Sequence, residues 1–216
     1  MQLSIDDVQG MNIEFEPRRT KYVNLSCSED ELYSNLHDDC KYSIRKAKKN
    51  GIYIRETLNV RNFIDEFYEQ FTDVFKKHNL HIVKSKKWYY NAVSTMYPQH
   101  MMLLEAVTSD GNIAATGIIL VAGKYASTWQ TASYSKFQHL RPNEILRWEA
   151  MRRCKRRGVT MVNMCGTQAY KDKFGAELIM IPRLFFYKWH WLLHAKRIAK
   201  SLYYKYRQLI THLKKE

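Results

Sequence analysis

The sequence lacks the marks of several protein classes. Its four cysteines contain no Cys-x-x-Cys pair, so neither a zinc knuckle nor a dithiol redox motif is expected. Lys188 and His190 interrupt the longest apolar run, residues 184–193, which is too short to span a bilayer. The first residues carry acid where a secretory signal needs base. These absences predict a cytoplasmic protein with reduced thiols.

Acidic residues are scarce relative to basic ones. The chain has 216 residues, with 35 Lys and Arg against 21 Asp and Glu, which gives a formal charge of +14. This charge implies a polyanionic neighbour, and its sign leaves open nucleic acid, an anionic membrane surface or a phosphorylated substrate. Hydrophobic residues make up 45% of the chain, enough to build the core of a single α/β domain.

Hydrophobic periodicity predicts mainly helices in the first half of the chain. Ser28 and Glu31 have the spacing of a capping box, and apolar residues then recur at helical spacing until Gly51. A strand is expected at 20–25 and another at 52–55. Two further helices are predicted, one with an apolar face between Phe63 and Phe75 and one at 88–97.

The period changes to that of strands after residue 100. Three β-branched runs, at 101–107, 113–121 and 125–133, are separated by turn residues and predict an antiparallel meander. Pro142 opens a helix that Gly158 ends. Strands at 159–164 and 178–186, with a short helix near Tyr170 between them, complete the order.

This order of elements predicts an α+β fold, a mixed and largely antiparallel sheet with helices on both faces. The expected organisation is an N-terminal segment at 1–19, one domain at 20–187 and a basic amphipathic helix at 188–216. The tail carries an apolar stripe flanked by cations. Such a stripe docks on its own domain or on a partner, and the alternative for 188–214 is an anionic membrane surface, which would make the protein membrane-peripheral.

Two basic segments are candidates for chemistry. The first, residues 41–51, has five cations and no acid, and either a solvated helix end or phosphate binding explains it. In the second, Lys171 follows directly on a strand, where an ammonium can stabilise an oxyanion, although the pattern alone favours an ordinary surface lysine. His190 and His194 have the spacing of a helical zinc pair, but no third ligand is evident, and no metal site is predicted.

Read in order, these segments resemble the FemAB-type and BioF-associated acetyltransferase-like domains of the GNAT superfamily. The similar stretches are Pro17-Arg-Arg-Thr20 with Tyr22, Ser28-Glu-Asp-Glu-Leu32, Tyr42-Ser-Ile-Arg45-Lys46-Ala47 with Gly51, Leu140-Arg141-Pro142-Asn143 with Trp148-Glu149-Ala150, and Tyr170-Lys171 with Phe174-Gly175.

The resemblance implies a GNAT-like fold, usually doubled, of which this chain holds the second domain. Better-known members transfer amino acids from charged tRNA to peptidoglycan precursors. It also implies that Lys171 stabilises negative charge in the transition state, with Tyr170 where the family often has Phe. A partner chain would then supply the first domain. Residues 134–142 contain no glycine, whereas GNAT enzymes that bind coenzyme A cradle pyrophosphate there, which argues against acetyl-CoA.

The leading hypothesis is therefore an acyltransferase that moves an amino acid or acyl group to an amine of a peptidoglycan or polysaccharide precursor of the cell envelope. Aminoacyl-tRNA or acyl-CoA would be the donor. Catalysis is assigned to Lys171 and Tyr170, and substrate binding to five residues: Arg45, Lys46, Trp129, Tyr134 and Arg141. The alternatives are an acetyl-CoA-dependent N-acetyltransferase and a basic module that binds RNA or a membrane without turnover.

Overall fold

The computed structural model describes residues 13–189, 191, 192, 194–196, 198, 199 and 201–203. The chain forms two compact units. The central unit is Thr20–Ile179, and the terminal unit joins Met1–Arg19 to Met180–Glu216. Within the described residues, no helix is both long and apolar enough to cross a bilayer.

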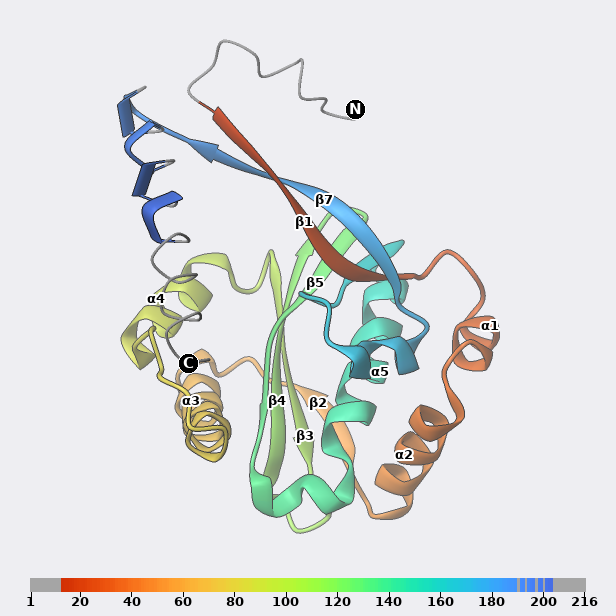
Figure 1. Cartoon of the computed structure of the whole chain (residues 1–216). Coiled ribbons are helices and arrows are strands. Elements are labelled where there is room, and N and C mark those ends of the chain that lie inside the picture. Colours follow the sequence, from red (N-terminus) through yellow and green to blue (C-terminus); the bar gives the residue numbers. More distant parts are fainter. Residues whose placement is uncertain (1–12, 190, 193, 197, 200, 204–216) are drawn as a thin grey trace, which may run out of the picture. The chain divides into compact units, whose positions relative to one another are not determined.

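Seven strands form one open sheet in the order β2-β3-β4-β5-β6-β1-β7 (Figure 1). The strands are β1 (Ile13–Asn24), β2 (Tyr53–Glu56), β3 (Met101–Val107), β4 (Ile113–Ala122), β5 (Tyr125–Ser133), β6 (Met161–Asn163) and β7 (Glu177–Phe186). The pairs β2–β3, β3–β4, β4–β5 and β1–β6 are antiparallel, whereas β5 and β6 are parallel. The expected mixed, largely antiparallel α+β sheet is confirmed.

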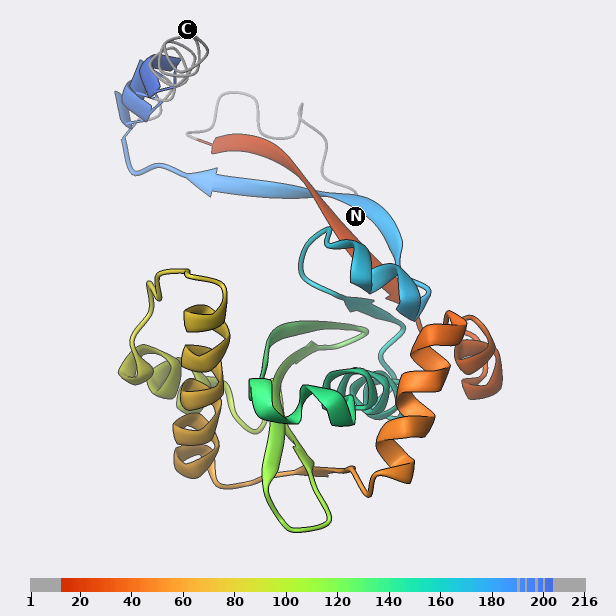
Figure 2. The ribbon, with the colours of Figure 1, turned by 60° about the horizontal axis from the view of Figure 1, so that its bottom comes forward.

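Helices cover both faces of the sheet in the central unit (Figure 2). One face carries α1 (Glu29–Ser34), α2 (Asp38–Lys49) and α5 (Pro142–Arg156), and the other carries α3 (Val60–Lys77) and α4 (Lys86–Met96). Two short 3-10 helices, η2 (Ser135–Leu140) and η3 (Ala169–Phe174), complete the elements. Each face buries its own apolar cluster, because strands in the middle of the sheet send alternate side chains to opposite sides.

The predicted single helix from Ser28 to Gly51 is wrong, because the chain forms two helices, α1 and α2, with a break between them. The capping box of Ser28 and Glu31 is present as expected. At the break, the His37 amide donates to the Lys173 carbonyl at 3.0 Å, and the His37 side chain caps α2. Gly175 lies so close that an added Cβ would be 3.2 Å from the Asn35 carbonyl oxygen. Contacts with η3, distant in sequence, thus end α1.

The meander and the helix after it agree with the sequence prediction. β3, β4 and β5 differ from the predicted strands by one residue at most. α5 begins with Pro142 in its first turn, and Gly158, at φ +78°, follows its end. The helix lies close to β4 at Gly117, where an added Cβ would be 2.7 Å from Leu146 Cδ2. Glycine at this position therefore permits the close approach of α5 to the sheet.

The terminal unit contains the ends of two strands and a helical segment. The strand predicted at 20–25 is longer than expected and begins at Ile13, inside the segment predicted to be irregular. The described residues from 191 to 203 are helical, so the tail helix begins later than the expected 188. The sequence predicts Leu192, Leu202, Leu209 and Leu213 on one side of this helix; Leu192 is half-buried and Leu202 is exposed. Leu209 and Leu213 lie outside the described residues.

Candidate active site

The candidate site lies where the parallel strands β5 and β6 diverge. Their parallel pairing covers only Tyr125–Ser127 on β5, opposite Met161–Asn163 on β6. A β-bulge against β4 makes Trp129 the extra residue of β5, and the strand then continues to Ser133 beside β4. A crevice beyond the carboxyl ends of parallel strands is where open α/β sheets bind ligands. The divergence therefore marks the carboxyl end of β5 as a binding position.

A cavity of about 360 Å³ lies at this position, within the central unit. It is lined by the end of β5, the first turns of α5, the end of α3, Gln138 of η2, and η3. Its lining residues are Val74, His78, Thr131, Ala132, Ser133, Gln138, Asn143, Glu144, Arg147, Tyr170 and Lys173. Three stretches of chain that are far apart in sequence, residues 74–78, 131–147 and 170–173, thus meet at one hollow.

Arg147 is the central cation of this cavity. Its guanidinium donates to Thr131 Oγ1 at 2.6 Å and lies 5.2 Å from the centre of the Tyr170 ring. Because Arg147 lies on the second turn of α5, its side chain points back toward the start of the helix. A half-exposed aromatic ring and a fixed guanidinium form a surface that suits a planar or anionic group.

A second, acidic feature lies at the start of α5. Glu144 forms an ion pair with Lys173 at 2.5 Å, and its side chain is only 13% exposed. Asn143 donates from its amide to Ser133 Oγ at 2.9 Å, which ties the helix start to the end of β5. The first turn of α5 therefore presents a neutralised carboxylate rather than an open group of backbone N–H donors.

Lys171 is buried behind this cavity. Its ammonium donates to the Cys165 carbonyl at 2.8 Å and to Gln168 Oε1, and it lies 5.6 Å from the Tyr170 ring that Arg147 also contacts. Burial lowers the pKa of Lys171, and the nearby positive charges of Arg147 and Lys21 act in the same direction. Two of its three N–H groups are thus directed at residues of the loop between β6 and η3.

The same loop is held by residues of β1. Thr20 Oγ1 donates to Asn163 Oδ1 at 2.7 Å and accepts from the Gly166 amide at 3.0 Å. Lys21, also buried, pairs with Asp172 at 2.5 Å. Gly166 lies so close to Lys171 that an added Cβ would be 3.3 Å from the Lys171 ammonium nitrogen. The position of Lys171 is therefore set by a network of buried polar contacts.

The structure does not bring the predicted phosphate-binding residues to this cavity. Arg45 lines a different cavity of about 590 Å³ between α1, α2 and α5, which shares no lining residue with the first. Lys46 is half-buried on α2, and Arg141 is an exposed residue in the left-handed region that precedes α5. Of these three residues, only Arg141 is next in sequence to an element that lines the candidate active site.

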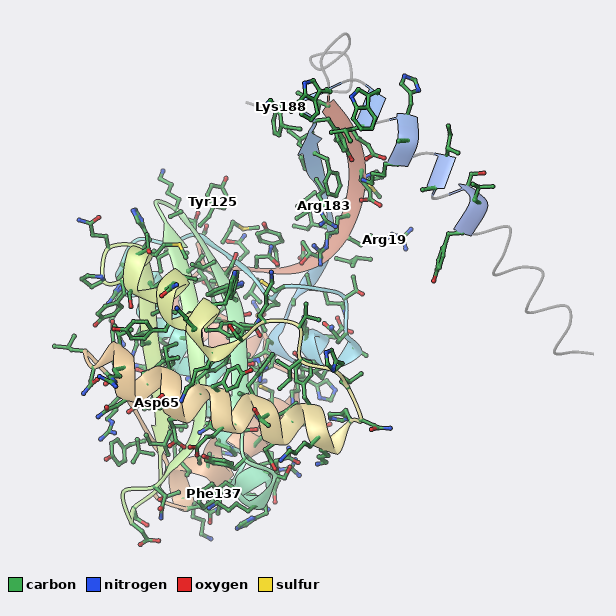
Figure 3. The ribbon with its side chains drawn as sticks, turned by 90° about the vertical axis from the view of Figure 1, so that its left-hand side faces the viewer. Arg19, Asp65, Tyr125, Phe137, Arg183 and Lys188 are labelled. Carbon is green, nitrogen blue, oxygen red and sulfur yellow. The ribbon has the colours of Figure 1, made fainter. Side chains whose placement is uncertain are left out.

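The two predicted cleft aromatics lie on the side of the sheet that α3 and α4 cover, outside the cavity. Trp129 packs in the apolar cluster under α3 and α4, 5.9 Å from the Trp88 ring. Tyr134 donates from its hydroxyl to Glu69 of α3 at 2.9 Å, and burial raises its pKa. Figure 3 views this side, with α3 and its Asp65 facing the reader. Neither ring is among the lining residues of the cavity.

Of the residues predicted from sequence, only Tyr170 lines the cavity, and Lys171 lies directly behind it. Sequence reasoning missed Thr131, Arg147 and the Glu144–Lys173 pair. One signal could have found two of the polar residues: Asn143 and Arg147 have i,i+4 spacing at the start of the helix that follows the meander. Among the described residues, no three His, Cys, Asp or Glu side chains are grouped closely enough to hold a metal ion.

The sequence profile of the acetyltransferase (GNAT) domain family matches residues 34–172. The chain belongs to this family, whose members are acyltransferases. No curated protein sequence matches the chain. Solved structures with a similar fold include FemX, at 13% identity and a TM-score of 0.69, aligned over 81% of this chain and 65% of FemX.

Two other similar structures come from lysylphosphatidylglycerol synthetases. The C-terminal domain of such a synthetase from Agrobacterium fabrum has 12% identity and a TM-score of 0.62, over 83% of this chain and 63% of that domain. L-PGS from Bacillus licheniformis has 12% identity and a TM-score of 0.57, aligned over 92% of this chain and 69% of L-PGS. These likenesses establish the GNAT-like fold, and the chain spans about two thirds of the length of each structure.

Proposed function

We propose that this chain transfers an aminoacyl or acyl group to an amine of a cell-envelope precursor, with the donor bound in the cavity at the end of β5. The observation that carries the proposal is the convergence of β5, the start of α5 and η3 around a hollow that holds Arg147 and Tyr170. The chain is a GNAT-family domain, and the hollow lies at the carboxyl end of β5, beyond the point where β5 and β6 diverge.

The chemistry requires an acceptor amine to attack the donor carbonyl, so that negative charge develops on the carbonyl oxygen. The bond from the carbonyl carbon to the donor's ester oxygen or thioester sulfur then breaks, and the leaving group takes up the proton that the amine loses. Arg147 is a permanent cation on the cavity wall, and Lys171 lies against the same aromatic ring. Electrostatic stabilisation of an oxyanion is worth most where water is excluded. In this proposal, Lys171 supplies its remaining N–H to the oxyanion, Arg147 orients the donor, and Tyr170 covers the reacting group.

An aminoacyl ester suits this site better than acyl-CoA. The segment before α5 forms η2 rather than a glycine-rich turn, and Pro142 has no N–H to offer. Glu144 places a carboxylate in the first turn of α5, where the pyrophosphate of coenzyme A would otherwise bind the helix N-terminus. The Glu144–Lys173 pair thus occupies this helix start, which supports a donor without pyrophosphate at this position.

The envelope acceptor is supported by the proteins that share the fold. FemX and the lysylphosphatidylglycerol synthetases point to acceptors of the cell envelope, and the positive charge of the chain suits a phosphorylated acceptor or tRNA. Because the chain spans about two thirds of these structures, a partner chain that supplies the remaining part of the acceptor cleft belongs to the proposal.

The test is incubation of the chain with aminoacyl-tRNA, acetyl-CoA and amine-bearing peptidoglycan or polysaccharide precursors, with mass spectrometry of the products. An aminoacylated precursor is the expected product, and Arg147→Met should remove most of it. Arg61→Met, on α3 and outside the cavity, is the matched control and should leave it unchanged. Acetylated product from acetyl-CoA alone would instead establish an N-acetyltransferase, and salt-sensitive RNA binding without any product would establish a binding module.

A further inference from the structure

The terminal unit presents an apolar surface on the helical residues from 191 to 203. Trp191, Ala195, Ile198 and Leu202 recur at intervals of three and four residues, which places them on one side of a helix. Trp191, Ile198 and Leu202 are 61%, 62% and 61% exposed, and Ala195 is also exposed. We call these four residues the apolar stripe.

The other side of the helical segment is held by the strands of the same unit. Lys196 donates to Glu14 of β1 at 2.6 Å and to the Tyr187 hydroxyl at 2.8 Å, and it lies 4.0 Å from the centre of the Phe185 ring. Leu192, one turn earlier, is half-buried. The helix thus has one side fixed to the strands, and the apolar stripe is turned away from that side.

Aromatic and cationic side chains border the stripe. The rings of Trp189 and Trp191 stack with centroids 6.3 Å apart, and the Lys188 ammonium lies 4.8 Å from the Trp189 ring. Figure 3 shows Arg183 and Lys188 along β7 and the residues that follow it. Tryptophan rings with a lysine beside them are typical of the membrane interface, where one part of the ring is apolar and the other is wet.

The charge of the tail decides among the occupants of this surface. From residue 188 to 216 the sequence contains eight Lys or Arg and a single acid, Glu216. A second copy of the same helix would bring like charges together, whereas an anionic lipid surface complements them. Interfacial helices combine such an apolar side with a cationic one, and both contribute to binding.

We infer that the apolar stripe and its cations dock the terminal unit on an anionic lipid bilayer. The helix would lie in the plane of the interface, with Trp191, Ile198 and Leu202 among the acyl chains and the cations at the headgroups. This inference concerns a binding surface and holds whether or not the proposed transfer reaction is correct, because its readout needs no turnover.

The experiment is co-sedimentation of the full chain with vesicles of mixed phosphatidylglycerol and phosphatidylcholine, and with vesicles of phosphatidylcholine alone. The wild-type chain should bind the anionic vesicles at least tenfold more tightly, and added salt should weaken the binding. The double variant I198S/L202S should lose at least tenfold in affinity for the anionic vesicles. The matched control, L58S/V83S, removes two apolar side chains of the central unit that are more exposed, at 81% and 82%, and should bind like the wild type.

Equal binding by I198S/L202S and the control would overturn the inference, as would equal affinity for both vesicle types. Light scattering of the wild type adds a further outcome: a dimer that I198S/L202S dissociates, without vesicle binding, would assign the stripe to self-association instead. Melting temperatures verify that both variants fold. Trp191→Ser tests the other end of the stripe in the same assay and should also lower the affinity.

Discussion

Two lysines of η3 carry the same charge but differ in burial and in their partners. Lys171 is 3% exposed and donates to the Cys165 carbonyl and to Gln168 Oε1. Lys173, two residues later, pairs with Glu144 on the cavity wall. From sequence alone, Lys173 is expected to be an inert neighbour of Lys171. Substitution of Lys173 would leave the charge of a nearly buried carboxylate uncompensated, so Lys173 does not serve as a silent control for Lys171.

The first prediction concerns Lys171→Met. The change removes two part-buried hydrogen bonds from a charged donor, so the free energy of unfolding should fall by about 1–3 kcal/mol. If the ammonium also stabilises the oxyanion, the transfer rate should fall by roughly a hundredfold or more. Thermal melting and the turnover rate of the variant measure the two effects.

The matched control for this prediction is Gln168→Leu. It removes one of the two acceptors of Lys171 from the same loop but keeps the ammonium. It should lose stability while retaining most of the transfer rate. Equal rate losses in the two variants would show that Lys171 acts only by holding the loop, as a positioning residue.

At the scale of elements, helix–sheet contacts decide where helices can lie. Gly117 allows α5 to approach β4, and contacts from η3 divide the helical region after Ser28 into α1 and α2. On the opposite face, Gln70 of α3 is fully buried and accepts from Thr116 Oγ1 of β4 at 2.9 Å. Each of these contacts joins segments that are distant in sequence.

The second prediction tests the contact between α5 and β4. Gly117→Ala should destabilise the protein by about 1–3 kcal/mol, because Leu146 must move in a filled core. Leu146→Ala alone should cost about 2–5 kcal/mol through the cavity that it leaves. The double variant should be clearly more stable than the sum of the two predicts, since the added methyl occupies space that Leu146 has vacated. Denaturant unfolding of all four proteins gives the coupling energy, and strict additivity would contradict the described contact.

The third prediction concerns Glu66 on α3. Burial raises the pKa of its carboxyl, although hydrogen bonds from Gln70 and Tyr134 act against the shift. The folded state therefore favours the protonated form, and this contribution is complete below the unfolded pKa of about 4.3 and is lost as pH rises through the folded pKa. Glu66→Gln should raise the melting temperature near neutral pH, and the gain should disappear at about pH 3.5. A pH-independent difference in melting temperature would contradict the assignment.

At the scale of the whole molecule, the main features are the positive charge of the chain and its division into two units. The formal charge of +14 is spread over both units, and Lys and Arg residues occur on α2, on α5 and in the tail. Arg45 and Lys48 line their own cavity, next to Glu29 and Asp30, which partly offset their charge. When such residues bind a polyanion, counterions are released, so the affinity of the chain for the polyanion depends on the salt concentration.

The fourth prediction is that tRNA binding by the full chain weakens steeply with salt. If Arg45 and Lys48 each contact a phosphate, substitution of either by Ala should reduce the slope of log K against log salt by about one unit. Lys124→Ala, at the turn between β4 and β5, is the control and should leave the slope unchanged. Filter binding over a salt series measures the slopes, and identical slopes for all variants would remove α2 from the binding surface.

Part of this architecture could be predicted from sequence because its causes are local. Strand-like runs separated by turn residues specify the meander from Met101 to Ser133, and Pro142 and Gly158 mark the limits of α5 through their backbone preferences. The same local reasoning failed between Ser28 and Gly51, where the apolar spacing continues through a break that only the packing of His37 and Gly175 against distant backbone produces.

The sequence by itself determined the class of fold, the excess of positive charge and the position of Tyr170 and Lys171 after a strand. Tertiary structure alone decided which side chains share the cavity, because Thr131, Arg147 and Tyr170 come from three elements that meet only when β5 and β6 diverge. It also placed Trp129 and Tyr134 against α4 and α3, outside the cavity, and gave Arg45 a separate cavity. Spacing along the chain specifies the side of an element on which a residue lies, but only the packing of elements specifies what that side faces.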